Sequence, residues 1–210
     1  MRRPGWKRGR PKFQGRQASI EWERLNHRAL QQLDVGYTAG AIENLLDVYW
    51  HLRSQRHVAP NEPDTIVVFY NLGCALAELG RLQQAVRFIA RAIRLGHAIF
   101  SDSDHRLASF HNGLGTVYER LGQRALALSA NREALTIDQR CCDQEAVARD
   151  LNQLGTVYFS IHKYDWAHSH FEEALELMTT ELGEHHPRVA PIRSNRDRAR
   201  FRLRIDNNPR

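Results

Sequence analysis

Four histidines lie close enough in the sequence to suggest a metal site: His168, His170, His185 and His186. Residues two apart on a helix point in quite different directions, and no cysteine or carboxylate set completes a tetrahedron around these imidazoles. We therefore expect no metal and no cofactor. Serine, histidine and aspartate are all present, but no nucleophile motif and no glycine-rich phosphate loop arranges them for catalysis. The sequence predicts a protein that is not an enzyme.

The three cysteines are too few and too badly spaced for a disulfide framework. Cys141 and Cys142 are adjacent, and adjacent cysteines bridge each other only with strain, while Cys74 stands alone. Reduced thiols in a reducing compartment are the simple interpretation. No stretch approaches the roughly 18 apolar residues of a membrane span, and no apolar segment follows the basic N-terminus as in a secretory signal. We expect a cytoplasmic protein, or a nuclear one if the organism is eukaryotic.

Charge is divided unevenly along the chain. The formal net charge of the 210 residues is +6. Residues 1–16 carry seven basic side chains and no acidic one, and residues 188–210 carry eight arginines against Asp197 and Asp206. A net charge of −7 remains for residues 17–187. An acidic body with two basic ends indicates ends that meet something anionic or ends that keep the protein soluble.

The N-terminal sequence from Lys7 to Lys12, KRGRPK, resembles the AT-hook. In that motif an arginine-glycine-arginine-proline core enters the narrow minor groove of A·T-rich DNA, where negative potential is concentrated. Arg8 and Arg10 would supply the core here, with Lys7 and Lys12 beside it. The alternative is a solvated basic tail, because short matches in basic tails are common. Residues 1–18 are rich in glycine, proline and charge, and we expect them to be disordered.

A helical pattern containing a leucine-glycine pair occurs three times, at Leu72-Gly73, Leu114-Gly115 and Leu154-Gly155. Each pair is followed by a break, at Gly80, Gly122 and His162, and then by a second helical run. Equivalent alanines stand at Ala41, Ala85, Ala127 and Ala167, at spacings of 44, 42 and 40 residues. A sustained period of this length predicts stacked helical hairpins, each covered by its neighbours.

The pattern predicts four hairpins within residues 19–188, at about 19–58, 63–97, 103–139 and 144–182. The first is degenerate, and Ser103 is a possible N-cap of the third. In residues 189–204 the leucine-glycine pair is replaced by Arg196-Asp197, which gives a following hairpin nothing apolar to pack on. We interpret these residues as a capping helix with Ile192 and Ala199 facing inward and the arginines facing water. A short tail, residues 205–210, follows.

These residues resemble the tetratricopeptide repeat. Its signature is carried by the leucine-glycine pairs, by Tyr118 and Tyr158, and by the alanines at Ala85, Ala92, Ala127, Ala134, Ala167 and Ala174. The resemblance implies an all-α, right-handed solenoid of about four hairpins. The period exceeds the standard 34 residues, which is similar to the long repeats of kinesin light chains.

The resemblance also implies a concave groove lined by the first helix of each hairpin. The groove-facing positions are Tyr70, Asn112, Thr116, Glu119, Arg149, Asn152, Thr156 and Phe159, together with Cys74 and Ala77. Asn112 and Asn152 recur in equal register and could hold a peptide backbone, or they are ordinary solvated residues. The basic clamp of chaperone-binding members is not matched. We expect a non-catalytic scaffold or adaptor that binds a protein or peptide segment; a nucleic-acid-associated adaptor using the N-terminal tail is the alternative.

Overall fold

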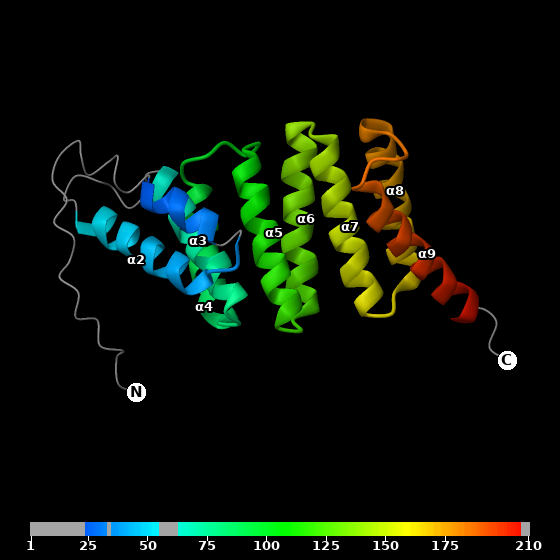
Figure 1. Ribbon diagram of the computed structural model, residues 1–210. Coiled ribbons are helices and arrows are strands. Elements are labelled where there is room, and N and C mark those ends of the chain that lie inside the picture. The colour runs from blue at the N-terminus through cyan, green and yellow to red at the C-terminus, as the bar shows by residue number, and fades with distance from the viewer. Residues whose placement is uncertain (1–23, 33–34, 55–62, 207–210) are drawn as a thin grey trace. The chain divides into compact units, whose positions relative to one another are not determined.

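The computed structural model describes residues 24–32, 35–54 and 63–206. All regular secondary structure in these ranges is helical, which confirms the predicted fold class (Figure 1). None of the helices in them is long and apolar enough to cross a membrane. After a helical stretch at residues 24–32 come α2 (Thr38–Ser54), α3 (Pro63–Glu78), α4 (Leu82–Gly96), α5 (His105–Arg120), α6 (Arg124–Cys141), α7 (Gln144–Ser160), α8 (Tyr164–Leu182) and α9 (Val189–Asp206).

Contacts divide the chain into two compact units, Met1–Leu95 and Gly96–Arg210. In the first unit α2 packs on α3. Helices α3 and α4 approach closely at Gly73, where an added Cβ would lie 2.4 Å from Cγ1 of Ile89. Ala85 and Ala92 of α4 are fully buried. The small residues of this hairpin therefore allow α3 and α4 to pack closely together.

The second unit contains α5 to α9, each packed on the next in chain order. Its two hairpins repeat the close approach seen at Gly73. A Cβ on Gly115 would lie 1.9 Å from Oδ1 of Asn131, and a Cβ on Gly155 would lie 2.6 Å from the Phe171 ring. Only a residue without a side chain fits at these positions. The alanines of the pattern are fully buried in both hairpins: Ala127, Ala134, Ala167 and Ala174.

The hairpin turns share one backbone conformation. Gly80 and Gly122 have φ values of +73° and +72°, and His162, which replaces glycine in the last hairpin, has φ +61°. In this turn the backbone N–H of His162 donates to the carbonyl of Phe159 at 3.1 Å, and the next N–H donates to Tyr158 at 3.0 Å. The same pair of bonds closes the helices before the two glycines. The turn keeps this geometry at His162, although a residue with a side chain is strained in the left-handed conformation.

Aspartates cap the first helices of the second unit. The carboxylate of Asp104 accepts a hydrogen bond from the backbone N–H of Arg106 at 2.9 Å, and Asp143 accepts one from Ala146 at 3.0 Å. The prediction that Ser103 caps the third hairpin is therefore wrong by one residue. Asp104 takes the role because its charge also pairs with the guanidinium of Arg106 at 2.6 Å.

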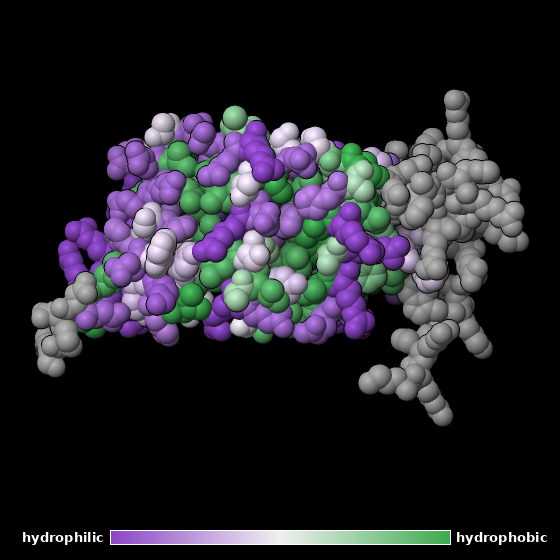
Figure 2. All heavy atoms as spheres, turned by 180° about the vertical axis from the view of Figure 1, so that it is seen from behind, coloured by the Kyte–Doolittle hydropathy of each residue, from purple (hydrophilic) through white to green (hydrophobic). Residues whose placement is uncertain are grey.

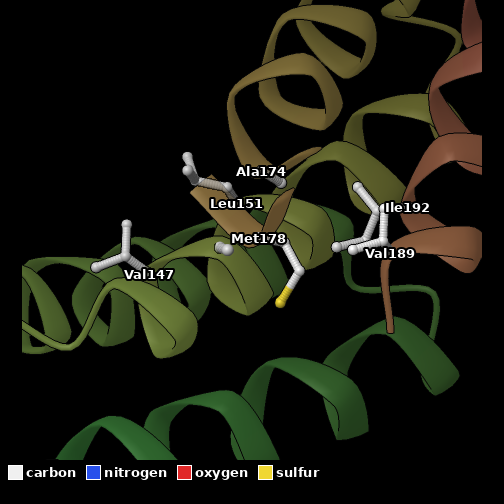
Figure 3. Packing of buried hydrophobic residues seen from close by; sticks show 7 residues of the cluster. Val147, Leu151, Ala174, Met178, Val189 and Ile192 are labelled. Atoms are coloured by element: carbon white, nitrogen blue, oxygen red, sulfur yellow. The ribbon is translucent and has the colours of Figure 1, made fainter. Parts of the chain in front are cut away.

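Helix α9 closes the second unit. Val189 and Ile192 join Leu151 of α7 and Met178 of α8 in one apolar cluster (Figure 3). Ala199 is fully buried in a neighbouring cluster formed by α7 and α8. The inward positions of Ile192 and Ala199 are therefore as the sequence predicted. The prediction that all the arginines face water is wrong for Arg196, which is half-buried and pairs with Glu172 of α8 at 3.3 Å.

Candidate functional site

The two asparagines at equal register on α5 and α7 both reach toward the next first helix. The amide of Asn112 donates to the carboxylate of Asp150 on α7 at 2.6 Å. The amide oxygen of Asn152 accepts a hydrogen bond from Asn195 on α9 at 3.1 Å. Asn112 and Asn152 are half-buried. These side chains already form hydrogen bonds between helices, so only their unused donors and acceptors are available to a ligand.

The threonines one turn further along keep their exposed position. Thr116 and Thr156 donate to the carbonyls of Asn112 and Asn152, four residues earlier in the same helix, at 3.1 and 3.0 Å. Their hydroxyl oxygens retain acceptor capacity toward solvent. Arg149, one turn before Asn152, is also exposed. The face formed by these residues of α5 and α7 is polar and uncharged apart from Arg149.

Glu119 is half-buried at the end of α5, and burial raises the pKa of its carboxyl against an opposing effect of Asn131. Tyr70 lies in the first unit, where it is half-buried next to Cys74. Burial raises the pKa of both the Tyr70 phenol and the Cys74 thiol. Both groups are therefore neutral at physiological pH. The thiol of Cys74 is reduced and free, like those of Cys141 and Cys142.

Two buried carboxyl groups lie beside Asn112, and sequence reasoning missed them. Asp150 is fully buried and Asp138, on α6, is 2% exposed. Burial, together with the neighbouring Asp138, raises the pKa of Asp150 to about 7 against the opposing hydrogen bond from Asn112. Burial also raises the pKa of Asp138. The second oxygen of Asp150 has no donor in the described structure, so the pair is satisfied only when it holds a proton.

One signal in the sequence could have revealed this pair. Asp150 stands one residue before Leu151 and three after Val147, so on a helix it adjoins apolar side chains, where a solvated carboxylate would not be expected. A carboxylate on the buried face of a helix indicates a partner on a neighbouring helix. The partner, Asn112, lies 38 residues earlier, and the sequence alone does not select it.

A groove of about 680 Å³ lies between α7 and α9. Phe159 of α7 and Phe201 of α9 contribute its aromatic side chains, and Arg193, Arg198 and Arg202 contribute its cations. The sequence analysis assigned Phe159 to the concave groove of the repeats and gave the residues of α9 no binding role. Figure 2 shows one face of the molecule, on which hydrophilic and hydrophobic side chains are mixed.

The remaining candidates do not assemble into a site. In the part of the chain that the structure describes, no three His, Cys, Asp or Glu side chains are grouped so that they could hold a metal ion. His168 pairs with Glu172 at 3.2 Å, and Nδ1 of His170 donates to the Trp166 carbonyl at 2.8 Å. The residues proposed for nucleic-acid contact, Lys7, Arg8, Arg10 and Lys12, lie outside the described residues.

Comparison with known proteins places this helical row in a family. Sequence models of the tetratricopeptide repeat match residues 105–180 and 66–95, together half of the chain. No curated protein sequence matches the chain significantly. The chain belongs to the tetratricopeptide repeat family, whose members are generally non-catalytic scaffolds for protein–protein interaction.

Solved structures of low sequence identity share the fold. A putative kinesin light chain from Podosopora anserina with nearly identical repeats is 15% identical, covers 91% of this chain and 89% of its own, and has a TM-score of 0.77. BtubC (BKLC) from P. vanneervenii is 19% identical, covers 92% of both chains, and has a TM-score of 0.70. The apo form of RapI is 12% identical, with a TM-score of 0.74 over 90% of this chain and 51% of its own. The kinesin-light-chain-like resemblance is thereby confirmed at the level of the fold.

Proposed function

We propose that the chain is a non-catalytic scaffold that binds an extended or helical segment of a partner protein on the face formed by α5 and α7. The observation that carries the proposal is the exposure of Thr116 and Thr156 at equal register. Each threonine directly follows a glycine that packs against the second helix of its hairpin. The glycine serves the packing, whereas the threonine is exposed and can be used for binding. Exposed polar positions that recur along a row of helices suit the backbone of a bound segment.

The test is a pair of double variants with the same chemistry on two faces. Thr116→Arg with Thr156→Arg adds two large side chains to the face formed by α5 and α7. The control, Thr136→Arg with Thr180→Arg, adds them to α6 and α8, where two exposed threonines make the same bond to a carbonyl four residues earlier, at 2.9 and 2.8 Å. Both variants gain the same charge.

Affinity capture with the full chain, read by quantitative mass spectrometry, should find partners that are lost in the first variant and kept in the control. Circular dichroism checks that both variants are folded. Equal partner lists for the two variants and the wild-type chain would contradict binding at this face.

The nucleic-acid-associated alternative depends on the sequence KRGRPK at Lys7–Lys12 and its resemblance to the AT-hook. The basic tail would contact phosphates while the acidic repeats recruit a protein. Deletion of residues 1–16 should then abolish retention on A·T-rich duplex DNA at low salt. Unchanged retention of the truncated chain would exclude this role for the tail.

A further inference from the structure

The groove between α7 and α9 carries positive charge that the described residues do not neutralise. Arg193 is paired with Glu184 at 3.4 Å, and Asp197 is paired with Arg196 at 2.9 Å. Arg198 and Arg202 have no carboxylate within ion-pair distance in the described part of the chain. One turn apart on α9, they lie on the same side of the helix and face the same groove.

The same groove exposes apolar surface beside these cations. Phe201, which lines the groove, is 63% exposed. Phe159 contributes from α7, with the Arg198 guanidinium 5.2 Å from its ring centroid. A volume of about 680 Å³ lies within the range of sites that hold a ligand, and large exposed apolar groups next to charge are typical of interaction surfaces.

We propose that this groove binds an acidic segment of a partner protein, with one large apolar side chain packed against Phe159 and Phe201 and carboxylates on Arg198 and Arg202. The proposal deepens the scaffold function above by naming the chemistry of the partner. Charge selects this occupant over the chain's own ends, because residues 1–16 contain no acidic side chain and neither do residues 207–210. A second copy of α9 would bring arginines onto arginines.

Nucleic acid fits the groove less well than an acidic peptide. One face of the Phe159 ring is occupied by Arg198, and Tyr164 meets the ring edge-on with centroids 5.1 Å apart. In the groove, Phe201 alone is left as a largely exposed ring, whereas proteins that bind single strands stack successive bases on several aromatic side chains. A peptide carboxylate needs only the guanidinium groups of Arg198 and Arg202, which have no carboxylate partner among the described residues and can be engaged in bidentate fashion.

The test uses the full chain and four fluorescein-labelled probes in anisotropy titrations. The first is a decapeptide of aspartate and glutamate with one central leucine. The second replaces that leucine with serine, the third replaces the acidic residues with lysine, and the fourth is a ten-nucleotide thymidine oligomer. The first probe should bind most tightly, and its affinity should fall as salt is raised.

Two charge-reversal variants of α9 distinguish binding in the groove from a general effect of the net charge of the protein. Arg198→Glu with Arg202→Glu should weaken binding of the leucine probe about tenfold, the loss expected when two exposed ion pairs become repulsive. Arg200→Glu with Arg204→Glu changes the net charge equally at exposed positions outside the groove and should leave affinity within about threefold. Phe201→Ser, at an exposed position, should weaken the leucine probe and not the serine probe.

Four outcomes would overturn the proposal: no binding of the leucine probe at about 1 mM, equal losses in the two arginine variants, thymidine binding as tight as peptide binding, or self-association that only the Arg198/Arg202 variant abolishes. Failure here is distinguishable from failure of the scaffold function. If the peptides do not bind but the Thr116/Thr156 variant still loses partners, the scaffold function stands and only the acidic partner is excluded.

Discussion

Replacing Asp150 with asparagine should change how the stability of the protein depends on pH. In the folded chain the pKa of Asp150 is raised to about 7, chiefly by burial, whereas an aspartate in the unfolded chain titrates near 3.9. Between these values the folded state holds a proton that the unfolded state has released. The free energy of unfolding therefore falls as pH rises through this window, and the loss is complete above about pH 7.

The magnitude follows from the width of that window. About three pKa units at about 1.4 kcal/mol each give at most about 4 kcal/mol, of which about 2–3 kcal/mol lies between pH 5 and pH 8. Asp138 lies beside Asp150 and its pKa is raised as well, so the two carboxyls share the effect. Arg149, His105 and Asp143 also face this pair and oppose or add to it.

Asparagine at position 150 retains the oxygen that accepts from Asn112 and brings an amide that can donate to Asp138 in place of the proton. The unfolding free energy of Asp150→Asn minus that of the wild-type chain should therefore rise by about 2–3 kcal/mol from pH 5 to pH 8. Taking this difference cancels the groups common to both chains. The assay is urea unfolding followed by circular dichroism.

The control is Asp102→Asn, which makes the same chemical change at an exposed aspartate before α5. A flat difference for Asp150→Asn over the same range, or a variant less stable than the wild-type chain at pH 8, would refute the assignment of a shared proton to this pair.

Three further substitutions test the local packing, each by thermal or urea unfolding. Gly115→Ala should destabilise the protein by about 1–3 kcal/mol, because its Cβ would overlap the fully buried Asn131; unchanged stability would show that the two helices can move apart. His162→Gly should stabilise it by about 0.5–1 kcal/mol, since relief of the left-handed strain outweighs loss of the 2.7 Å hydrogen bond between His162 and the Tyr164 hydroxyl; a net loss would mean that this bond dominates. Asp104→Ala should cost about 1 kcal/mol by removing the cap of α5, and no change would show that the cap is dispensable.

The repeats could be predicted from the sequence because their packing depends on residue size at fixed spacing. Gly73, Gly115 and Gly155 each lie where a side chain would collide with the second helix, and this requirement leaves a direct trace in the sequence. The left-handed turn was marked by Gly80 and Gly122, and the register alone identified its third occurrence at a histidine. The cap was misplaced by one residue because serine and aspartate are both good capping residues.

The polar side chains could be placed but their bonds could not be predicted. Asn112 and Asn152 were assigned to the groove by register, and the structure shows each bonded to the following first helix. Their recurrence has a simple cause, because the same position on successive helices faces the same neighbour. Arg198 and Arg202 were predicted only to face water with the other arginines of residues 189–204. Because they lie four residues apart on α9, both face the same groove, which Phe159 of α7 also lines.

The bonds from Asn112 to Asp150 and from Asn195 to Asn152 have a mechanical consequence for the second unit. They tie α5 to α7 and α7 to α9, so they act as struts between successive hairpins. The curvature of a solenoid is the sum of small rotations between its repeats. One strut ends on a carboxyl that gains or loses a proton near pH 7, which should make the stiffness of this row adjustable. Small-angle X-ray scattering of the wild-type chain and Asp150→Asn across that pH range would measure it, with the variant expected to keep a constant radius of gyration.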